Sequence, residues 1–196
     1  MLKDYKAKRN FKKTPEPAGR QRSATDHLRF VVQRHDATRL HYDFRLELNG
    51  VLKSWAVPKG PSMNPADKRL AVHVEDHPVD YISFEGTIPE GNYGAGTVQV
   101  WDKGNYLPIN EKMEPISERQ ALLQLKKGEL KFFLQGEKLN GGFVLVRLHD
   151  DEEKNWLLIK HRDEFATNRK YNSETLAKKT AAKKKTITKK RHAKKS

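Results

Sequence analysis

Short runs of alternating apolar and polar residues, separated by turn residues, dominate the chain between residues 26 and 170. In the clearest run, residues 40–48, apolar side chains occupy the even positions and ionisable side chains the odd positions. Asn49-Gly50 then supplies a tight hairpin turn into an apolar run over residues 51–57. Further strand candidates cover residues 30–33, 69–75, 94–104, 129–134, 142–148 and 156–160. This pattern predicts at least seven β-strands.

One helix is expected after residue 117. Ser117 and Gln120 form a capping-box pair, an apolar stripe follows, and Gly128 ends the helix. Many strands and one clear helix, without alternation of strands and helices, favour a mainly β fold. We therefore predict a compact, closed or nearly closed β-barrel with one or two short helices.

The net charge of +14 is concentrated at the two ends of the chain. Residues 1–22 carry eight basic and two acidic side chains, and residues 177–196 carry ten basic and no acidic ones. We therefore expect a basic, irregular N-terminal arm over residues 1–25 with few contacts, a barrel domain over residues 26–170 and a disordered Lys-rich tail over residues 171–196. Clustered basic ends favour a polyanionic partner such as a nucleic acid, although a solvated tail without a partner has the same composition.

Composition excludes several classes of protein. The chain has no cysteine, so disulfides, thiolate metal sites and a cysteine nucleophile are excluded, and a reducing compartment is favoured. No stretch approaches the roughly 18 apolar residues of a membrane span, and the first residues lack the apolar segment of a signal peptide. We expect a cytoplasmic protein without membrane contact.

The ionisable face of residues 40–48 is the strongest indication of chemistry. His41, Asp43 and Arg45 follow one another on it, about 7 Å apart. Imidazole and carboxylate bind divalent transition metals, and a guanidinium suits an oxyanion. His35 precedes this strand and could fold back to complete two imidazoles and one carboxylate around a metal with open positions. A solvated face of ion pairs is the alternative interpretation of the same row.

A second strand repeats the pattern. Arg69, His73 and Glu75 share one face of residues 69–75, and His77 follows at the turn. If the two strands are neighbours, their polar rows form one site. The glycine-rich segment 91–96 lacks the flanking elements of a dinucleotide-binding loop and instead predicts a tight turn into a strand.

Several ordered blocks resemble the 3′-phosphoesterase domain found in DNA ligase D proteins. Residues 30–47, with the sequence FVVQRHDATRLHYDFRLE, resemble its opening block. The later blocks are matched in order by residues 55–61, 75–78 with Tyr81, 84–86 and 91–96, and the closing block by residues 156–160. The resemblance covers about residues 5–163. Neither a ligase nor a polymerase domain is present in this sequence, so a free-standing member of the family is expected.

The resemblance implies a function at DNA ends. It implies a compact β-barrel that works with Mn²⁺, or another divalent transition metal, during non-homologous end joining. The expected activity removes a terminal ribonucleoside from a primer 3′ end and then the exposed 3′-phosphate. The expected partners are DNA or RNA-tipped DNA 3′ ends, together with a separate ATP-dependent DNA ligase, a primase-like polymerase and a Ku-type end-binding protein. A nucleoid-associated location follows from these partners.

The resemblance also assigns residues. It implies that the metal ligands are His35, His41 and Asp43, and that the scissile phosphate is bound by Arg45, His77 and Tyr81. The supporting active-site positions that it implies are Gln33, Lys59, Arg69 and Glu75, with Arg9 and Glu16 in the N-terminal arm. Asn10 departs from the aspartate usual in the family, so a better monoesterase than nuclease is expected if that carboxylate serves the diesterase step.

Three hypotheses remain for the chemistry. In a phosphoesterase, a protonated His77 or Tyr81 could assist the leaving oxygen. An iron-dependent oxygenase would instead use His41, Asp43 and His77 as a facial triad. A non-catalytic nucleic-acid-binding protein would use only the basic ends.

Overall fold

The computed structural model describes residues 2–19, 27–149 and 153–175. Its strands are β1 (Leu28–Asp36), β2 (His41–Leu48), β3 (Val51–Val57), β4 (Arg69–His77), β5 (Gly86–Ile88), β6 (Gly96–Ile109), β7 (Glu129–Gly136), β8 (Asn140–Arg147) and β9 (Asn155–Lys160). The helices are α1 (Lys3–Ala7), the 3₁₀ helix η1 (Val79–Ser83) and α2 (Glu118–Lys127). The predicted strands are all found, whereas the three-residue β5 is too short to leave a pattern in the sequence.

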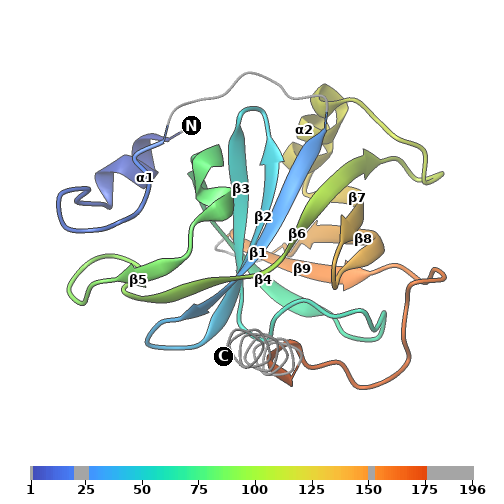
Figure 1. The fold of residues 1–196 in the computed structure, drawn as a ribbon. Coiled ribbons are helices and arrows are strands. Elements are labelled where there is room, and N and C mark those ends of the chain that lie inside the picture. Colours follow the sequence, from blue (N-terminus) through green and yellow to red (C-terminus); the bar gives the residue numbers. More distant parts are fainter. Residues whose placement is uncertain (1, 20–26, 150–152, 176–196) are drawn as a thin grey trace, which may run out of the picture.

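The sheet closes into an antiparallel barrel (Figure 1). The strand order is β1-β2-β3-β4-β9-β8-β7-β6, and β1 also pairs with β6, which leaves β5 as an addition to the outer edge of β6. Full closure removes free sheet edges from the barrel. The predicted mainly β barrel is confirmed.

Alternation of side chains gives the barrel wall two different faces. The interior holds large apolar side chains such as Phe30, Phe44, Trp55 and Phe132. Because side chains alternate across a strand, the intervening residues of β1–β3 point outwards. That outer face is covered too: Asp43 is only 6% exposed and Arg45 only 2%. The polar row of β2 is therefore buried beyond the half-buried His41, and the interpretation of this row as a solvated face of ion pairs is wrong.

The cover over this outer face consists of the N-terminal arm, η1 and β5. A second apolar cluster joins them to the barrel wall, with Tyr5, Leu52, Tyr81, Phe84, Ile88 and Val98 as its buried members. Tyr5 is fully buried and its hydroxyl donates to the carbonyl of Pro17 at 2.6 Å. We expected an irregular arm with few contacts. This expectation is wrong for the described part, because α1 forms and the burial of Tyr5 binds the arm to the barrel.

Helix α2 begins and ends as the sequence predicts. Ser117 and Gln120 form the reciprocal capping box, and Gly128 ends the helix in the left-handed region with φ of +94°. The helix packs its apolar stripe, including Ala121, against the barrel core.

The last described residues pack on the barrel rather than leaving it at residue 171. Ser173 Oγ donates to the Pro61 carbonyl at 2.7 Å, and Trp101 Nε1 donates to the Ser173 carbonyl at 3.1 Å. Glu174 accepts hydrogen bonds from Arg34. The expected tail therefore begins later than residue 171, and its remaining part, residues 176–196, lies outside the described residues. Within the described chain, the helices are too short and too polar to cross a membrane.

Candidate active site

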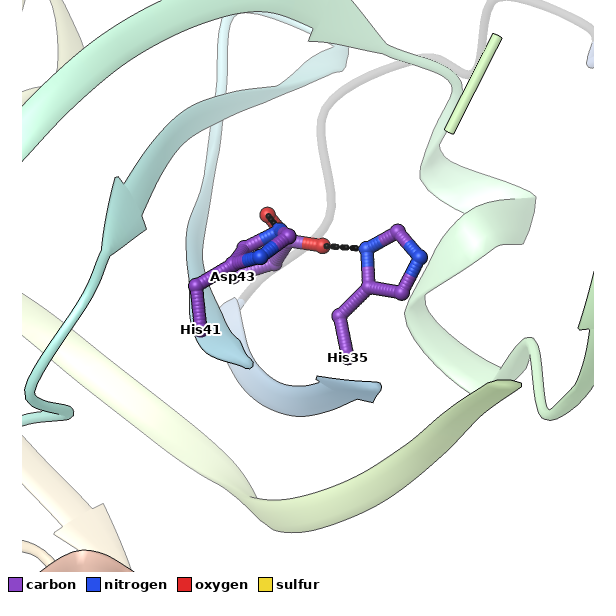
Figure 2. A group of neighbouring side chains, drawn as sticks. All are labelled: His35, His41 and Asp43. Atoms are coloured by element: carbon purple, nitrogen blue, oxygen red, sulfur yellow. Dashed lines mark ion pairs between the residues drawn. The ribbon is translucent and has the colours of Figure 1, made fainter. Parts of the chain in front are cut away.

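The pairing of β1 with β2 places three metal-binding side chains together. His35 lies opposite His41, and Gln33 opposite Asp43, in the antiparallel register. The predicted strand over residues 30–33 ended before His35, whereas β1 extends to Asp36 and includes it. One ligating atom from each of His35, His41 and Asp43 lies within 4.8 Å of the others. Figure 2 shows the imidazole of His35 facing Asp43, with His35 Nδ1 at 3.4 Å from Asp43 Oδ2.

Backbone carbonyls orient both imidazoles. His35 Nε2 contacts the Gly94 carbonyl at 3.0 Å, and His41 Nδ1 contacts the Arg39 carbonyl at 2.9 Å. Since a carbonyl only accepts, each of these nitrogens donates, and the other ring nitrogen of each histidine faces Asp43. In an imidazole that binds a metal, this second nitrogen supplies the lone pair. His35 Nδ1 is buried and has no hydrogen-bond partner within residues 2–19, 27–149 and 153–175. Two imidazole nitrogens and one carboxylate form a ligand set that fits a divalent transition metal. The buried His35 Nδ1, which lacks a hydrogen-bond partner in the described chain, would gain one ligand bond there.

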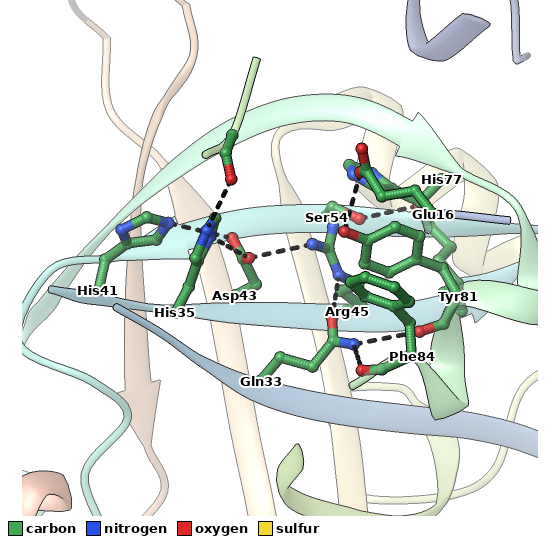
Figure 3. A network of polar contacts seen from close by, with 12 residues as sticks. Glu16, Gln33, His35, His41, Asp43, Arg45, Ser54, His77, Tyr81 and Phe84 are labelled. Carbon is green, nitrogen blue, oxygen red and sulfur yellow. Dashed lines mark hydrogen bonds and ion pairs between the residues drawn. The ribbon is translucent and has the colours of Figure 1, made fainter. Parts of the chain in front are cut away.

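Arg45 lies next to these three residues on β2. Its Nε donates to Gln33 Oε1 at 2.8 Å and its Nη2 contacts Asp43 Oδ2 at 3.1 Å (Figure 3). Gln33 Nε2 in turn donates to the carbonyls of Tyr81 and Phe84. Arg45 Nη1 is buried and has no partner among the described residues. A fixed guanidinium with one free donor suits an oxyanion.

The charge of Asp43 depends on its neighbours. Burial opposes ionisation of this carboxyl group, but Arg45 and the two histidines outweigh burial and hold its pKa well below the ordinary value. Asp43 is therefore a carboxylate at neutral pH.

A β-bulge brings His77 to the same face. Ser54 pairs with Val74, but Leu52 pairs with His77, so β4 carries one extra residue between these pairs. Such a bulge reverses the alternation of side chains beyond it. His77 therefore joins Asp43 and Arg45 on the outer face.

His77 is neutral in this environment. Its Nδ1 contacts the Glu75 carbonyl at 2.9 Å and its Nε2 accepts from Arg9 Nη2 at 3.1 Å. Burial, with Arg45 and Arg9 nearby, lowers the pKa of His77 well below 6.5. A protonated His77 is thus disfavoured as the acid that the sequence suggested. Tyr81 donates to Glu16 Oε1 at 3.0 Å, and burial raises its pKa, so it remains a phenol.

The N-terminal arm contributes one wall of the site through Arg9. Its side chain is 4% exposed, and its guanidinium contacts Glu16 Oε1 and Glu75 Oε1, both at 2.9 Å. Asn10 is exposed, and its side chain accepts the backbone N–H of Lys12 at 3.2 Å. Asn10 does not line the central cavity.

These residues enclose a cavity of about 210 Å³, called the central cavity below. Of the residues assigned by resemblance, its lining includes Arg9, Glu16, His35, His41, Asp43, Arg45, Glu75, His77 and Tyr81. Gln33 lies behind Arg45, fully buried.

Lys59 and Arg69 lie elsewhere, in a second pocket at the end of the barrel with Tyr42 and Tyr171. Arg69 Nη2 donates to Asp67 Oδ2 at 2.8 Å and to the Tyr171 carbonyl at 3.0 Å. The expectation of one site built from two neighbouring rows is wrong here. Strand β3 separates β2 from β4, and before the bulge the row of Arg69 lies with Ala71 on the face of the interior core.

The sequence did not indicate the loop between β5 and β6 as part of the site. Tyr93 and Gly94 line the central cavity, and the Gly94 carbonyl holds His35. The glycine-rich segment predicted a turn, and only the closure of the barrel brings that turn to His35.

The fold and the site together define a class: a closed β-barrel protein with a partly open cavity, on the outer face of its wall, that suits a cation and an oxyanion. The family described as DNA Ligase D 3′-phosphoesterase domain matches residues 33–147. The chain belongs to this family.

Three longer relatives are similar to the chain. The multifunctional non-homologous end joining protein LigD of Pseudomonas aeruginosa is 53% identical over 165 residues, covering 83% of this chain and 19% of that protein. Its counterpart in Mycolicibacterium smegmatis is 43% identical over 83% of this chain and 21% of that protein. The LigD DNA repair protein of Mycobacterium tuberculosis is 43% identical over 80% of this chain and 19% of that protein. The matched region thus spans about a fifth of the length of these relatives.

Proposed function

We propose that this chain is a metal-dependent phosphoesterase that processes DNA 3′ ends for end joining. It removes a terminal ribonucleoside and then the exposed 3′-phosphate. The observation that carries the proposal is the juxtaposition, in one cavity, of the His35–His41–Asp43 group with the unpartnered Arg45 Nη1. Membership of the 3′-phosphoesterase family and similarity to end-joining proteins support the same reaction.

His35, His41 and Asp43 would hold the metal, with Mn²⁺ proposed as the ion because of the family. When bound, such an ion supplies Lewis-acid neutralisation of charge on a phosphate ester. Arg45 contributes a second positive charge from the protein itself. Its Nη1 donates to a phosphate oxygen, while Gln33 and Asp43 hold the other two nitrogens in place.

The remaining cavity residues act as hydrogen-bonding groups in fixed protonation states. Tyr81 is a phenol and offers one proton, which Glu16 now accepts. His77 is neutral, and its Nε2 accepts a hydrogen bond from Arg9 Nη2. This hydrogen bond holds the guanidinium of Arg9 at the cavity. Tyr81 is therefore the better candidate than His77 for donating a hydrogen bond to a leaving oxygen.

The proposed substrate and partners follow from the family rather than from the cavity. A DNA 3′ end, with or without a ribonucleotide, is the substrate. A ligase, a primase-like polymerase and a Ku-type protein are the proposed partners in end joining.

The direct test is a 5′-labelled primer–template whose primer ends in one ribonucleotide. Incubation with the protein and Mn²⁺ should shorten the primer to a 3′-hydroxyl end, and EDTA or His41→Ala should abolish shortening. His149→Ala is a matched control, because His149 is exposed and lies outside the cavity. Shortening that survives both EDTA and His41→Ala, or its absence with every divalent metal tried, would contradict the proposal.

The oxygenase hypothesis has less support. The metal-binding group among the described residues contains His35, not His77. A non-catalytic binder is excluded if the metal-dependent shortening is observed.

A further inference from the structure

The loop that carries Tyr93 is a compact double turn fixed beside His35. Asn92 N donates to the Pro89 carbonyl at 3.3 Å, and Ala95 N donates to the Asn92 carbonyl at 3.1 Å. Gly94 has φ of +76°, a conformation that suits glycine, and its carbonyl contacts His35. The position of Tyr93 is therefore tied to that of the metal-binding group.

The central cavity is too small for a nucleotide. Its volume of about 210 Å³ lies below the roughly 300 Å³ at which pockets for drug-sized ligands begin. An ion and a phosphoryl group fit this space, but the sugar and base must lie outside it. The site proposed above thus needs a neighbouring surface for the nucleoside.

A groove of about 730 Å³ lies directly beside the central cavity. Tyr93, Val74 and Glu75 line both spaces, so they form the wall between them. Three lysines and three acids line the groove, and two of the lysines are paired within it: Lys8 with Glu75, at 3.0 Å, and Lys53 with Asp76, at 2.8 Å. These pairs make the groove better suited to a neutral base than to a further phosphate.

Tyr93 has the properties of a stacking surface. Its side chain is 49% exposed, whereas the other tyrosine of these walls, Tyr81, is 2% exposed. Lys8 Nζ lies 4.9 Å from the centroid of the Tyr93 ring and Arg9 Cζ 5.5 Å from it. These cations of the N-terminal arm lie over the Tyr93 ring and fix its position. The exposed half of Tyr93 remains available to a ligand.

We propose that Tyr93 forms a nucleobase subsite: its ring stacks on the base of the nucleotide whose 3′-oxygen carries the phosphate bound by Arg45. The inference rests on the proposed function, because it needs a phosphate in the central cavity. Stacking uses the face that all bases share, so this subsite tolerates any base.

The test compares two oligonucleotides with a 3′-phosphate. One ends in a normal nucleotide, and the other has a tetrahydrofuran abasic residue at the same position. The dissociation constant is measured in EDTA and the release of phosphate in Mn²⁺, for the wild-type chain, Tyr93→Ala, Tyr93→Phe and Tyr93→Trp. Phe165→Ala is the control, since Phe165 is also exposed but lines neither cavity.

The expected result is specific to the base. Tyr93→Ala should weaken binding of the normal oligonucleotide about 5- to 150-fold, the range for loss of one base–aromatic stack. Tyr93→Ala should bind the abasic oligonucleotide with the affinity of the wild-type chain. Tyr93→Phe and Tyr93→Trp should retain binding of both oligonucleotides. An equal loss on both oligonucleotides, or no loss on either, overturns the inference.

The two proposals fail separately. If the wild-type chain releases no phosphate in Mn²⁺, the proposed function fails. The binding comparison in EDTA still decides whether Tyr93 contacts a base. If phosphate is released but Tyr93→Ala behaves as the wild type, only the base subsite is refuted.

Discussion

His35 and His41 face each other across the β1–β2 pairing, with their ring centroids 4.7 Å apart. Directly opposed residues on one face of an antiparallel pair approach within about 5.5 Å at their Cβ atoms. One step along the same face, Asp43 completes the group. Only five residues lie between the two histidines in sequence, so a hairpin suffices to form most of this site.

Loss of Asp43 should abolish metal binding. Asp43→Ala leaves two imidazoles without the carboxylate, and the thermal stabilisation by Mn²⁺ that binding to the folded state produces should disappear. Differential scanning fluorimetry with and without Mn²⁺ measures this. His149→Ala should keep the stabilisation, and an undiminished metal-induced shift in Asp43→Ala would show that the ion binds elsewhere.

Gln33 should act by positioning Arg45. Gln33→Ala removes the acceptor of Arg45 Nε and the donor to two carbonyls, all in a fully buried place. We expect turnover to fall about 10- to 100-fold, because a displaced Arg45 no longer meets the phosphate in the productive geometry. The free energy of unfolding should fall by about 1–3 kcal/mol, because buried polar groups lose their partners.

Steady-state kinetics of Gln33→Ala distinguish an effect on the position of Arg45 from an effect on metal binding. The loss should appear mainly in kcat, with Mn²⁺ affinity retained. Gln33→Glu, which keeps an acceptor for Arg45, should restore part of the rate. A variant with full activity would show that Arg45 needs no support from Gln33.

Tyr5 should control the docking of the N-terminal arm. Tyr5→Ala removes a fully buried ring at the contact of α1 with the barrel, and the arm carries Arg9 and Glu16 into the cavity. We expect faster trypsin cleavage after Lys12 or Lys13 and loss of activity, with the barrel still folded. Tyr5→Phe, which loses only the hydrogen bond to Pro17, should destabilise docking by about 1 kcal/mol. Unchanged cleavage in Tyr5→Ala would contradict this role.

His73 should make stability depend on pH. Its ring packs against both Trp55 and Trp156, and its buried Nε2 has no hydrogen-bond partner in the described part of the chain. Burial lowers the pKa of His73 below 6.5 despite Asp76, and Lys53 adds to the decrease. The unfolded chain therefore takes up a proton near pH 6.5 that the folded chain does not. Stability conferred by neutral His73 is complete above this pH and is lost as the pH falls below it.

Urea unfolding at pH 5 and pH 7.5 measures this contribution. His73→Phe should reduce the difference in unfolding free energy between the two pH values, whereas His149→Phe should not. An equal pH dependence in His73→Phe and the wild type would assign the effect to other groups.

Local patterns predicted much of this protein. The strict alternation of residues 40–48 followed by Asn49-Gly50 sufficed for a hairpin, and Ser117, Gln120 and Gly128 sufficed for α2, because each feature depends on neighbours a few residues away. The His41–Asp43–Arg45 row was readable for the same reason, since alternation alone puts these side chains on one face.

Tertiary structure decided which of the other polar residues share that site. Arg69 and His77 lie on one strand, yet a bulge between them turns only His77 towards Asp43, and no repeat in the sequence marks an extra residue. Arg9 and Tyr93 reach the cavity from an arm and a loop whose positions depend on burial of Tyr5 and on closure of the barrel. Sequence by itself thus determined the elements and the chemistry available on each one. The contacts between elements, which are set by packing over long separations in the chain, determined where that chemistry meets.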